Sequence, residues 1–71
     1  MHTDPSPQHG MVDGVEYEVR PEWLAGRNWW RVYVARSPKV LLRSRDYAIR
    51  AAEVLALDEA YYRQQAGAEH Q

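Results

Sequence analysis

Three stretches of the chain alternate apolar and polar residues in the way that is typical of β-strands. Residues 15–20 alternate strictly and are followed by Pro21, which we expect to end the first strand because proline cannot donate to a ladder. Residues 29–35 and 39–43 are rich in β-branched, aromatic and aliphatic residues and are separated by the turn signal Ser37-Pro38. The residues expected to face the core are Val15, Tyr17, Val19, Trp30, Val32, Val34, Val40 and Leu42.

A long amphipathic helix is predicted after the third strand. Ser44 is suited to cap it, Asp46 lies in the first turn, and the chain then runs to Gln65 without glycine or proline. One apolar stripe of this helix is predicted to face the sheet and consists of Ala48, Ala51, Ala52, Leu55 and Tyr62, with Ile49 and Ala56 at its border. A second stripe, formed by Val54, Leu57 and Tyr61, points away from the first, and one helix cannot bury both against one sheet.

These elements predict an α+β fold in which a three-stranded antiparallel meander packs against one C-terminal helix. The 71 residues suffice for one small core and exclude a two-domain protein. Residues 1–12 contain Pro5, Pro7 and Gly10 and show no periodicity, so we expect a disordered leader there. The single domain is expected over residues 13–64 and a frayed C-terminal tail over residues 65–71.

The amino-acid composition limits the kinds of site and the cellular location that we expect for this protein. The chain has no cysteine, which excludes a disulfide framework, a thiol nucleophile and a cysteine zinc site. No apolar run approaches the roughly 20 residues that span a bilayer, and the N-terminus lacks the pattern of a signal peptide. We therefore expect a soluble, cytoplasmic protein without membrane association.

Residues 42–56, with the sequence LRSRDYAIRAAEVLA, carry a family resemblance. An apolar residue, a serine cap, an acid and then Ala-Ile and Ala-Ala resemble the helix start of small bacterial and phage β-β-β-α domains. These include domains of unknown function and the arm-site DNA-binding domain of phage-type tyrosine recombinases. Leu42 replaces the usual phenylalanine and Tyr47 the second acid. The resemblance implies the same fold over about residues 15–60, and, in the recombinase relatives, a sheet that lies in the DNA major groove.

Charge is segregated along the chain although the formal net charge is only −1. Residues 27–50 contain seven basic residues and one acidic residue, whereas both ends are acidic. Nearly all the basic residues are arginines, which favour bidentate and stacking contacts. An alternative to a binding role is that Glu16 and Glu18 pair with Arg31 across the sheet.

The sheet face away from the helix is the best candidate for a binding surface. The predicted register places Trp29, Arg31 and Tyr33 there, with Leu41 and Arg43 from the third strand. Aromatic side chains between guanidinium groups are typical of interface hot spots and of surfaces that stack on nucleic acid bases. The alternative is that a tail or the Trp23-Leu24 segment covers these rings.

No catalytic, metal or cofactor site is predicted. His2, His9 and His70 all fall in segments expected to be mobile, where a general base or a metal ligand could not be held in place. The four glycines stand apart and form no phosphate-binding loop. We therefore expect a protein that is not an enzyme and that uses no cofactor.

The function that follows is a small non-catalytic binding module, expected to be a phage or mobile-element accessory protein that regulates or inhibits a host protein. Trp29, Arg31, Tyr33, Leu41 and Arg43 on the open sheet face, with Trp23 nearby, are the predicted partner-binding residues. One alternative is DNA binding through the same face. Another is a structural homo-oligomer, most simply a homodimer, whose seam consists of Val54, Leu57 and Tyr61.

Overall fold

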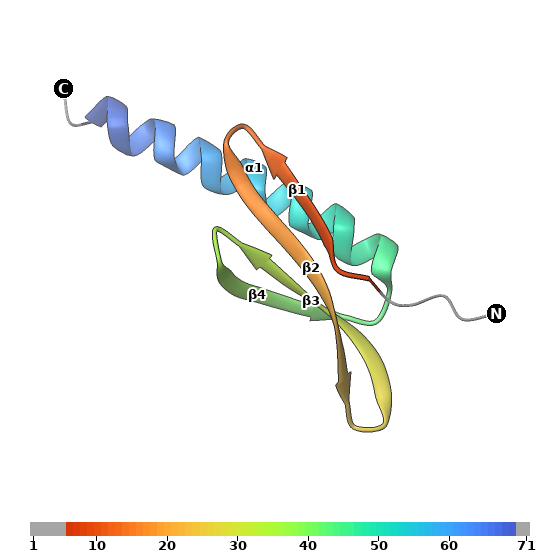
Figure 1. The fold of residues 1–71 in the computed structure, drawn as a ribbon. Helices are drawn as coiled ribbons and strands as arrows, with labels where there is room; N and C mark the ends of the chain where they lie inside the picture. The colour runs from red at the N-terminus through yellow and green to blue at the C-terminus, as the bar shows by residue number, and fades with distance from the viewer. Residues whose placement is uncertain (1–5, 70–71) are drawn as a thin grey trace.

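The computed structural model describes residues 6–69, which form one antiparallel sheet and one helix (Figure 1). The sheet contains β1 (Gln8–Val12), β2 (Val15–Leu24), β3 (Arg27–Val34) and β4 (Ser37–Leu42) in the order β1-β2-β3-β4. The helix α1 (Arg45–Glu69) follows β4 and packs across one face of the sheet. The predicted α+β class, with an antiparallel meander and one C-terminal helix, is therefore confirmed.

The predicted number of three strands is wrong, because residues 8–12 form the additional strand β1. Val12 pairs with Val15 across a tight turn in which Asp13 and Gly14 both have positive φ, 48° and 83°. Asp-Gly between two short strands is a strong hairpin signal, but Pro5, Pro7 and Gly10 before it argue against a strand. Gly10 also interrupts the alternation, and its missing side chain leaves room for the Tyr17 ring on the facing strand. Residues 1–5 of the expected leader lie outside the described residues.

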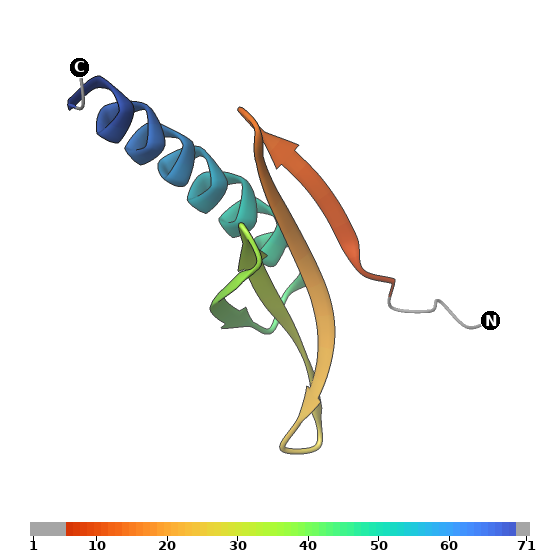
Figure 2. The same cartoon turned by 60° about the vertical axis from the view of Figure 1, so that its left-hand side comes forward.

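Strand β2 does not end at Pro21 as the sequence predicted. Pro21 pairs with Trp30 of β3, and the ladder continues to Leu24 opposite Arg27. Strand β1 covers β2 only as far as Val19, so beyond that point β2 is an edge strand, where a residue without an N–H group is tolerated. As a result, the β2–β3 hairpin extends as an arm beyond the rest of the sheet (Figures 1 and 2).

The core lies between the sheet and a row of small residues on α1. Its buried members are Val15, Val19, Val32, Val34, Ala48, Ala52, Ala56 and Ala60. Alanine at every fourth position keeps the helix close to the valine side chains, as the sequence pattern indicated for Ala48 and Ala52. Leu42 and Trp30 pack at the margin of this core, while Val40 on the edge strand is 36% exposed.

The prediction that Tyr62 is buried is wrong, since its side chain is 64% exposed. The buried row advances in steps of four residues and ends at Ala60, and two further residues turn the side chain about 160° around the helix axis. Ser44 caps the helix as expected: its Oγ accepts a hydrogen bond from the Tyr47 amide at 3.3 Å. The helix continues to Glu69, past the expected end at Gln65, and residues 70–71 lie outside the described residues.

Candidate functional site

The face of the sheet opposite α1 collects most of the residues that the sequence predicted to bind a partner. Because Val19 and Val32 point to the helix, their neighbours along β2 and β3 point the other way. Figure 2 shows α1 on one side of the sheet and no other element of residues 6–69 on the opposite side. We call this uncovered surface the open face; its members include Glu18, Arg20, Glu22, Trp29, Arg31, Tyr33 and Leu41.

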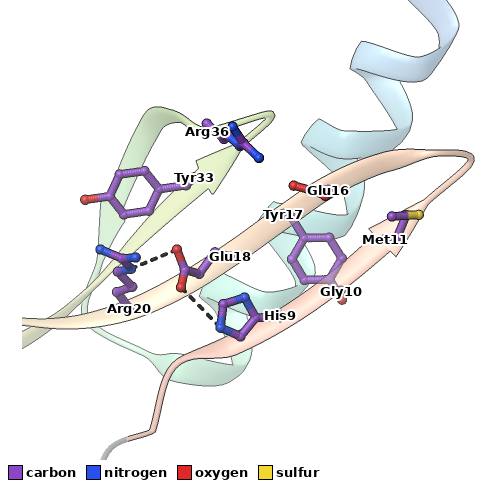
Figure 3. A pocket seen from close by; sticks show the side chains of 9 residues that line it. All are labelled: His9, Gly10, Met11, Glu16, Tyr17, Glu18, Arg20, Tyr33 and Arg36. Atoms are coloured by element: carbon purple, nitrogen blue, oxygen red, sulfur yellow. Dashed lines mark ion pairs between the residues drawn. The ribbon is translucent and has the colours of Figure 1, made fainter.

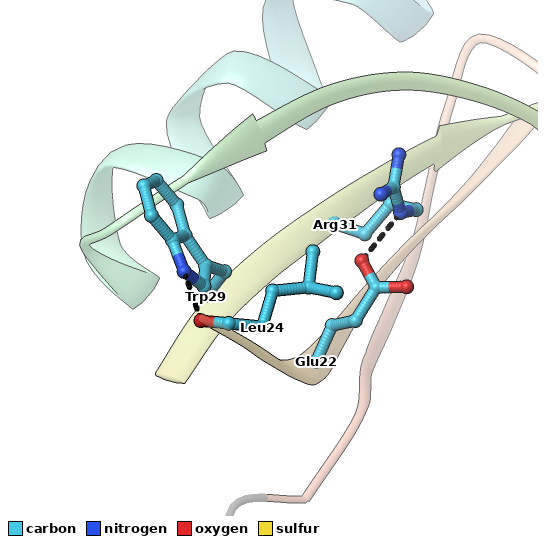
Figure 4. A network of polar contacts seen from close by, with 4 residues as sticks. All are labelled: Glu22, Leu24, Trp29 and Arg31. Atoms are coloured by element: carbon cyan, nitrogen blue, oxygen red, sulfur yellow. Dashed lines mark hydrogen bonds and ion pairs between the residues drawn. The ribbon is translucent and has the colours of Figure 1, made fainter. Parts of the chain in front are cut away.

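The Trp29 ring is fixed at the base of the hairpin arm. Its Nε1–H donates a hydrogen bond to the Leu24 carbonyl oxygen at 3.0 Å, and the guanidinium carbon of Arg43 lies 5.1 Å from the ring centroid. The Leu24 side chain lies on the same face of the sheet as Trp29 and Arg31 (Figure 4). Thus the segment containing Leu24 is a strand that borders the aromatic ring, instead of a loop folded over it.

Each of two arginines on the open face is paired with a glutamate of β2. Arg20 and Arg31 lie directly opposite each other in the register, an arrangement that would repel without compensation. Arg31 Nε lies 2.7 Å from Glu22 Oε2, and Arg20 Nε lies 2.8 Å from Glu18 Oε1. The expectation that Arg31 pairs with Glu16 or Glu18 is therefore wrong in its partner: Arg31 pairs with Glu22 because β2 continues beyond Pro21.

The Glu18 carboxylate holds a small polar network together. It accepts from Arg20, and its other oxygen lies 3.2 Å from His9 Nε2 of β1. The hydrogen bond and the negative charge of Glu18 raise the pKa of Arg20 above its ordinary value. The Arg20 guanidinium carbon in turn lies 5.4 Å from the Tyr33 ring centroid. Tyr33 therefore makes a cation–π contact with Arg20, as Trp29 does with Arg43.

A shallow concavity of about 770 Å³ lies beside this network (Figure 3). Its lining includes His9, Met11, Glu18, Arg20, Tyr33 and Arg36. The Met11 side chain is 62% exposed at its rim, so the concavity offers an apolar contact as well as charges of both signs. A depression of mixed polarity on an uncovered sheet face can receive side chains from a protein surface.

Trp23 is not brought together with the other predicted partner-binding residues. It pairs with Asn28 near the tip of the arm, on the face that Trp30 occupies, and its side chain is 66% exposed. The sequence signal that places it there is the alternation of β2, which continues through Pro21. The predicted seam residues Val54, Leu57 and Tyr61 lie on the outer side of α1, where their exposed fractions are 66%, 52% and 59%.

Residues with catalytic potential are dispersed over the described part of the chain. His9 belongs to β1, which corrects its assignment to a mobile segment, and its side chain is 71% exposed beside Glu18. Within residues 6–69 no group of three or more His, Cys, Asp or Glu side chains is placed to hold a metal ion. In the same range no helix combines the length and the apolarity required to span a membrane. His2 and His70 lie outside the described residues.

Comparisons of the chain with protein-family models, with curated proteins and with solved structures gave no match.

Proposed function

We propose that this protein is a non-catalytic module that binds another protein through the open face of its sheet. One observation carries the proposal: two aromatic rings on an uncovered face, Trp29 and Tyr33, each lie beneath a guanidinium group, from Arg43 and Arg20. Tryptophan, tyrosine and arginine are the residues most enriched in interface hot spots. Their contacts with one another hold the side chains in place before a partner arrives, which lowers the entropic cost of binding.

The chemistry of the open face defines the partner that it suits. Leu24, Leu41 and the edges of the two rings supply apolar area, and Arg43 lies at the margin without a carboxylate partner among the ion pairs of the described residues. A complementary protein surface would therefore place an aliphatic or aromatic side chain against Trp29 and a carboxylate near Arg43.

Nucleic acid is the less suitable ligand for this face, although the recombinase domains that the chain resembles bind DNA with their sheet. Contacts with phosphates dominate affinity for DNA and require cations that are free to neutralise them. Here Arg20 and Arg31 are already paired with Glu18 and Glu22, which would lie against the phosphates. Fluorescence anisotropy with a random-sequence duplex at low salt distinguishes the two ligands; micromolar binding that weakens steeply with salt would favour DNA.

The biological role that we propose is regulation or inhibition of a host protein by a phage or mobile-element accessory protein. The support is the small size of the chain and its resemblance to small phage and bacterial β-β-β-α domains. A single domain with one uncovered face can occupy a partner's surface without any chemistry of its own.

Affinity capture with matched variants tests the binding role. Immobilised wild type should retain one cellular protein that Trp29→Ala/Tyr33→Ala fails to retain, and Glu53→Ser, an exposed position on the helix, should retain it normally. Since Trp29 and Tyr33 are half-buried, thermal unfolding must show that the double variant is folded. Leu24→Ser/Arg43→Ser provides a second open-face variant whose residues are exposed, so its fold should be preserved. Retention of the same protein by both open-face variants would contradict the proposal.

A further inference from the structure

The outer side of α1 carries an apolar stripe that no other element of residues 6–69 covers. Tyr47, Val54, Leu57 and Tyr61 have exposed fractions between 52% and 69%. Their spacing of seven, three and four residues places them on one side of the helix, opposite the buried alanine row. Together with the exposed residues Arg50 and Asp58, they form a surface that we call the outer stripe.

The tyrosines and the charged residues of the outer stripe are spaced symmetrically about Val54, so that the stripe is complementary to a second copy of itself. Tyr47 and Tyr61 lie seven residues before and after Val54, while Arg50 and Asp58 lie four residues before and after it. When a second copy of the helix is laid antiparallel with the two Val54 residues level, each arginine is level with an aspartate and each Tyr47 with a Tyr61. A parallel pair would instead place like charges together at both positions.

We propose that the outer stripe is a homodimer interface in which two copies of α1 pair antiparallel around a two-fold axis at Val54. The axis generates two equivalent Arg50–Asp58 ion pairs and two tyrosine–tyrosine contacts, as the isologous geometry of a two-fold dimer requires. The paired segment, from Tyr47 to Tyr61, is about 21 Å long. The open faces of both sheets remain uncovered, so the dimer would present two copies of the binding surface.

Reversal of the charges tests the register of the dimer. We expect sedimentation equilibrium between about 1 and 500 μM to show a reversible dimer for the wild type, since a seam of one helix pair is small. Arg50→Asp and Asp58→Arg should each weaken association at least tenfold, because each places like charges together twice. The double variant Arg50→Asp/Asp58→Arg should restore it. Arg27→Asp, with the same change in net charge on the hairpin arm, should dimerise as the wild type does.

Cross-linking tests the position of the axis independently of affinity. The chain contains no cysteine, so Val54→Cys introduces a single thiol at the proposed axis, where it meets its own copy. Mild oxidation should give a covalent dimer of Val54→Cys, whereas Glu53→Cys, about 100° around the helix, should stay a monomer. A wild type that remains monomeric throughout the concentration range would overturn the proposal. Failure of the double charge reversal to restore association would overturn the register.

Discussion

Truncation of one valine in the core, with an identical truncation at the sheet edge as control, tests the packing of the fold. Val32 is fully buried in β3, and its register partner Val40 in β4 is 36% exposed. Val32→Ala removes two methyl groups from the core, each contributing about 0.8 kcal/mol. A residual cavity of roughly 40 Å³ at about 24 cal/mol per Å³ adds about 1 kcal/mol. The expected loss in the free energy of unfolding is therefore about 2–3 kcal/mol.

The same change at Val40 should cost less than about 1 kcal/mol, because the side chain is already partly in water and leaves no enclosed cavity. Urea denaturation followed by tryptophan fluorescence measures both values, and an unchanged m-value shows that the unfolding transition is comparable. A domain of this size has a total stability of roughly 3–10 kcal/mol, so the Val32 variant should lose a large part of it. Equal losses for the two variants would refute the assignment of Val40 to an exposed edge.

Three further substitutions test individual contacts by the same denaturation assay. Gly10→Ala should lower the free energy of unfolding by about 1 kcal/mol, because the new Cβ would meet the Tyr17 ring. In the Tyr17→Leu background the same substitution should cost little, and additive losses from the two substitutions would contradict this cause. Trp29→Phe removes the donor to the Leu24 carbonyl and should cost about 0.5–1.5 kcal/mol, whereas an unchanged stability would show that the hydrogen bond contributes nothing. Ala52→Leu should cost about 1–3 kcal/mol by forcing α1 from the sheet, and a stabilised variant would contradict the close packing.

The helix and the core faces of β2 and β3 were predictable because local patterns and tertiary packing agree there. The alternation in residues 15–20 places Val15 and Val19 inward, and the fold buries both completely. Ser44 is a favourable cap and does cap α1. The sequence pattern places Tyr62 on the wrong side because the buried row advances in steps of four residues and so drifts around the helix axis, away from the stripe on which Tyr62 lies.

Strand β1 and the hairpin arm were not predictable from single-residue propensities. Gly10 and Pro21 both argue against a strand when each is considered alone. In the fold, the facing Tyr17 ring fills the space beside Gly10, and Pro21 lies where β2 has no partner on its second edge. Both are properties of the neighbouring strand and do not appear in the local sequence.

The open face was predictable as a set of residues but not as a set of contacts. Period-two alternation is enough to place Trp29, Arg31 and Tyr33 on one side of the sheet. The pairing of Arg31 with Glu22 depends on how far β2 continues, and the position of Arg43 over Trp29 depends on the path of the chain after β4. Trp23 lies on the face opposite to Trp29 because β2 continues through residue 23, and the length of β2 does not follow from the local sequence.

Site-specific photo-cross-linking in cells tests the proposed binding face most directly. A benzophenone amino acid replaces Arg43, which is exposed beside Trp29, and in a separate variant replaces Glu53, which is exposed on α1 about 100° around the helix from Val54. The proposed function predicts a covalent adduct of one defined mass with another protein from position 43 and none from position 53. An adduct from position 53 with none from position 43 would contradict the assignment of the open face as the binding surface.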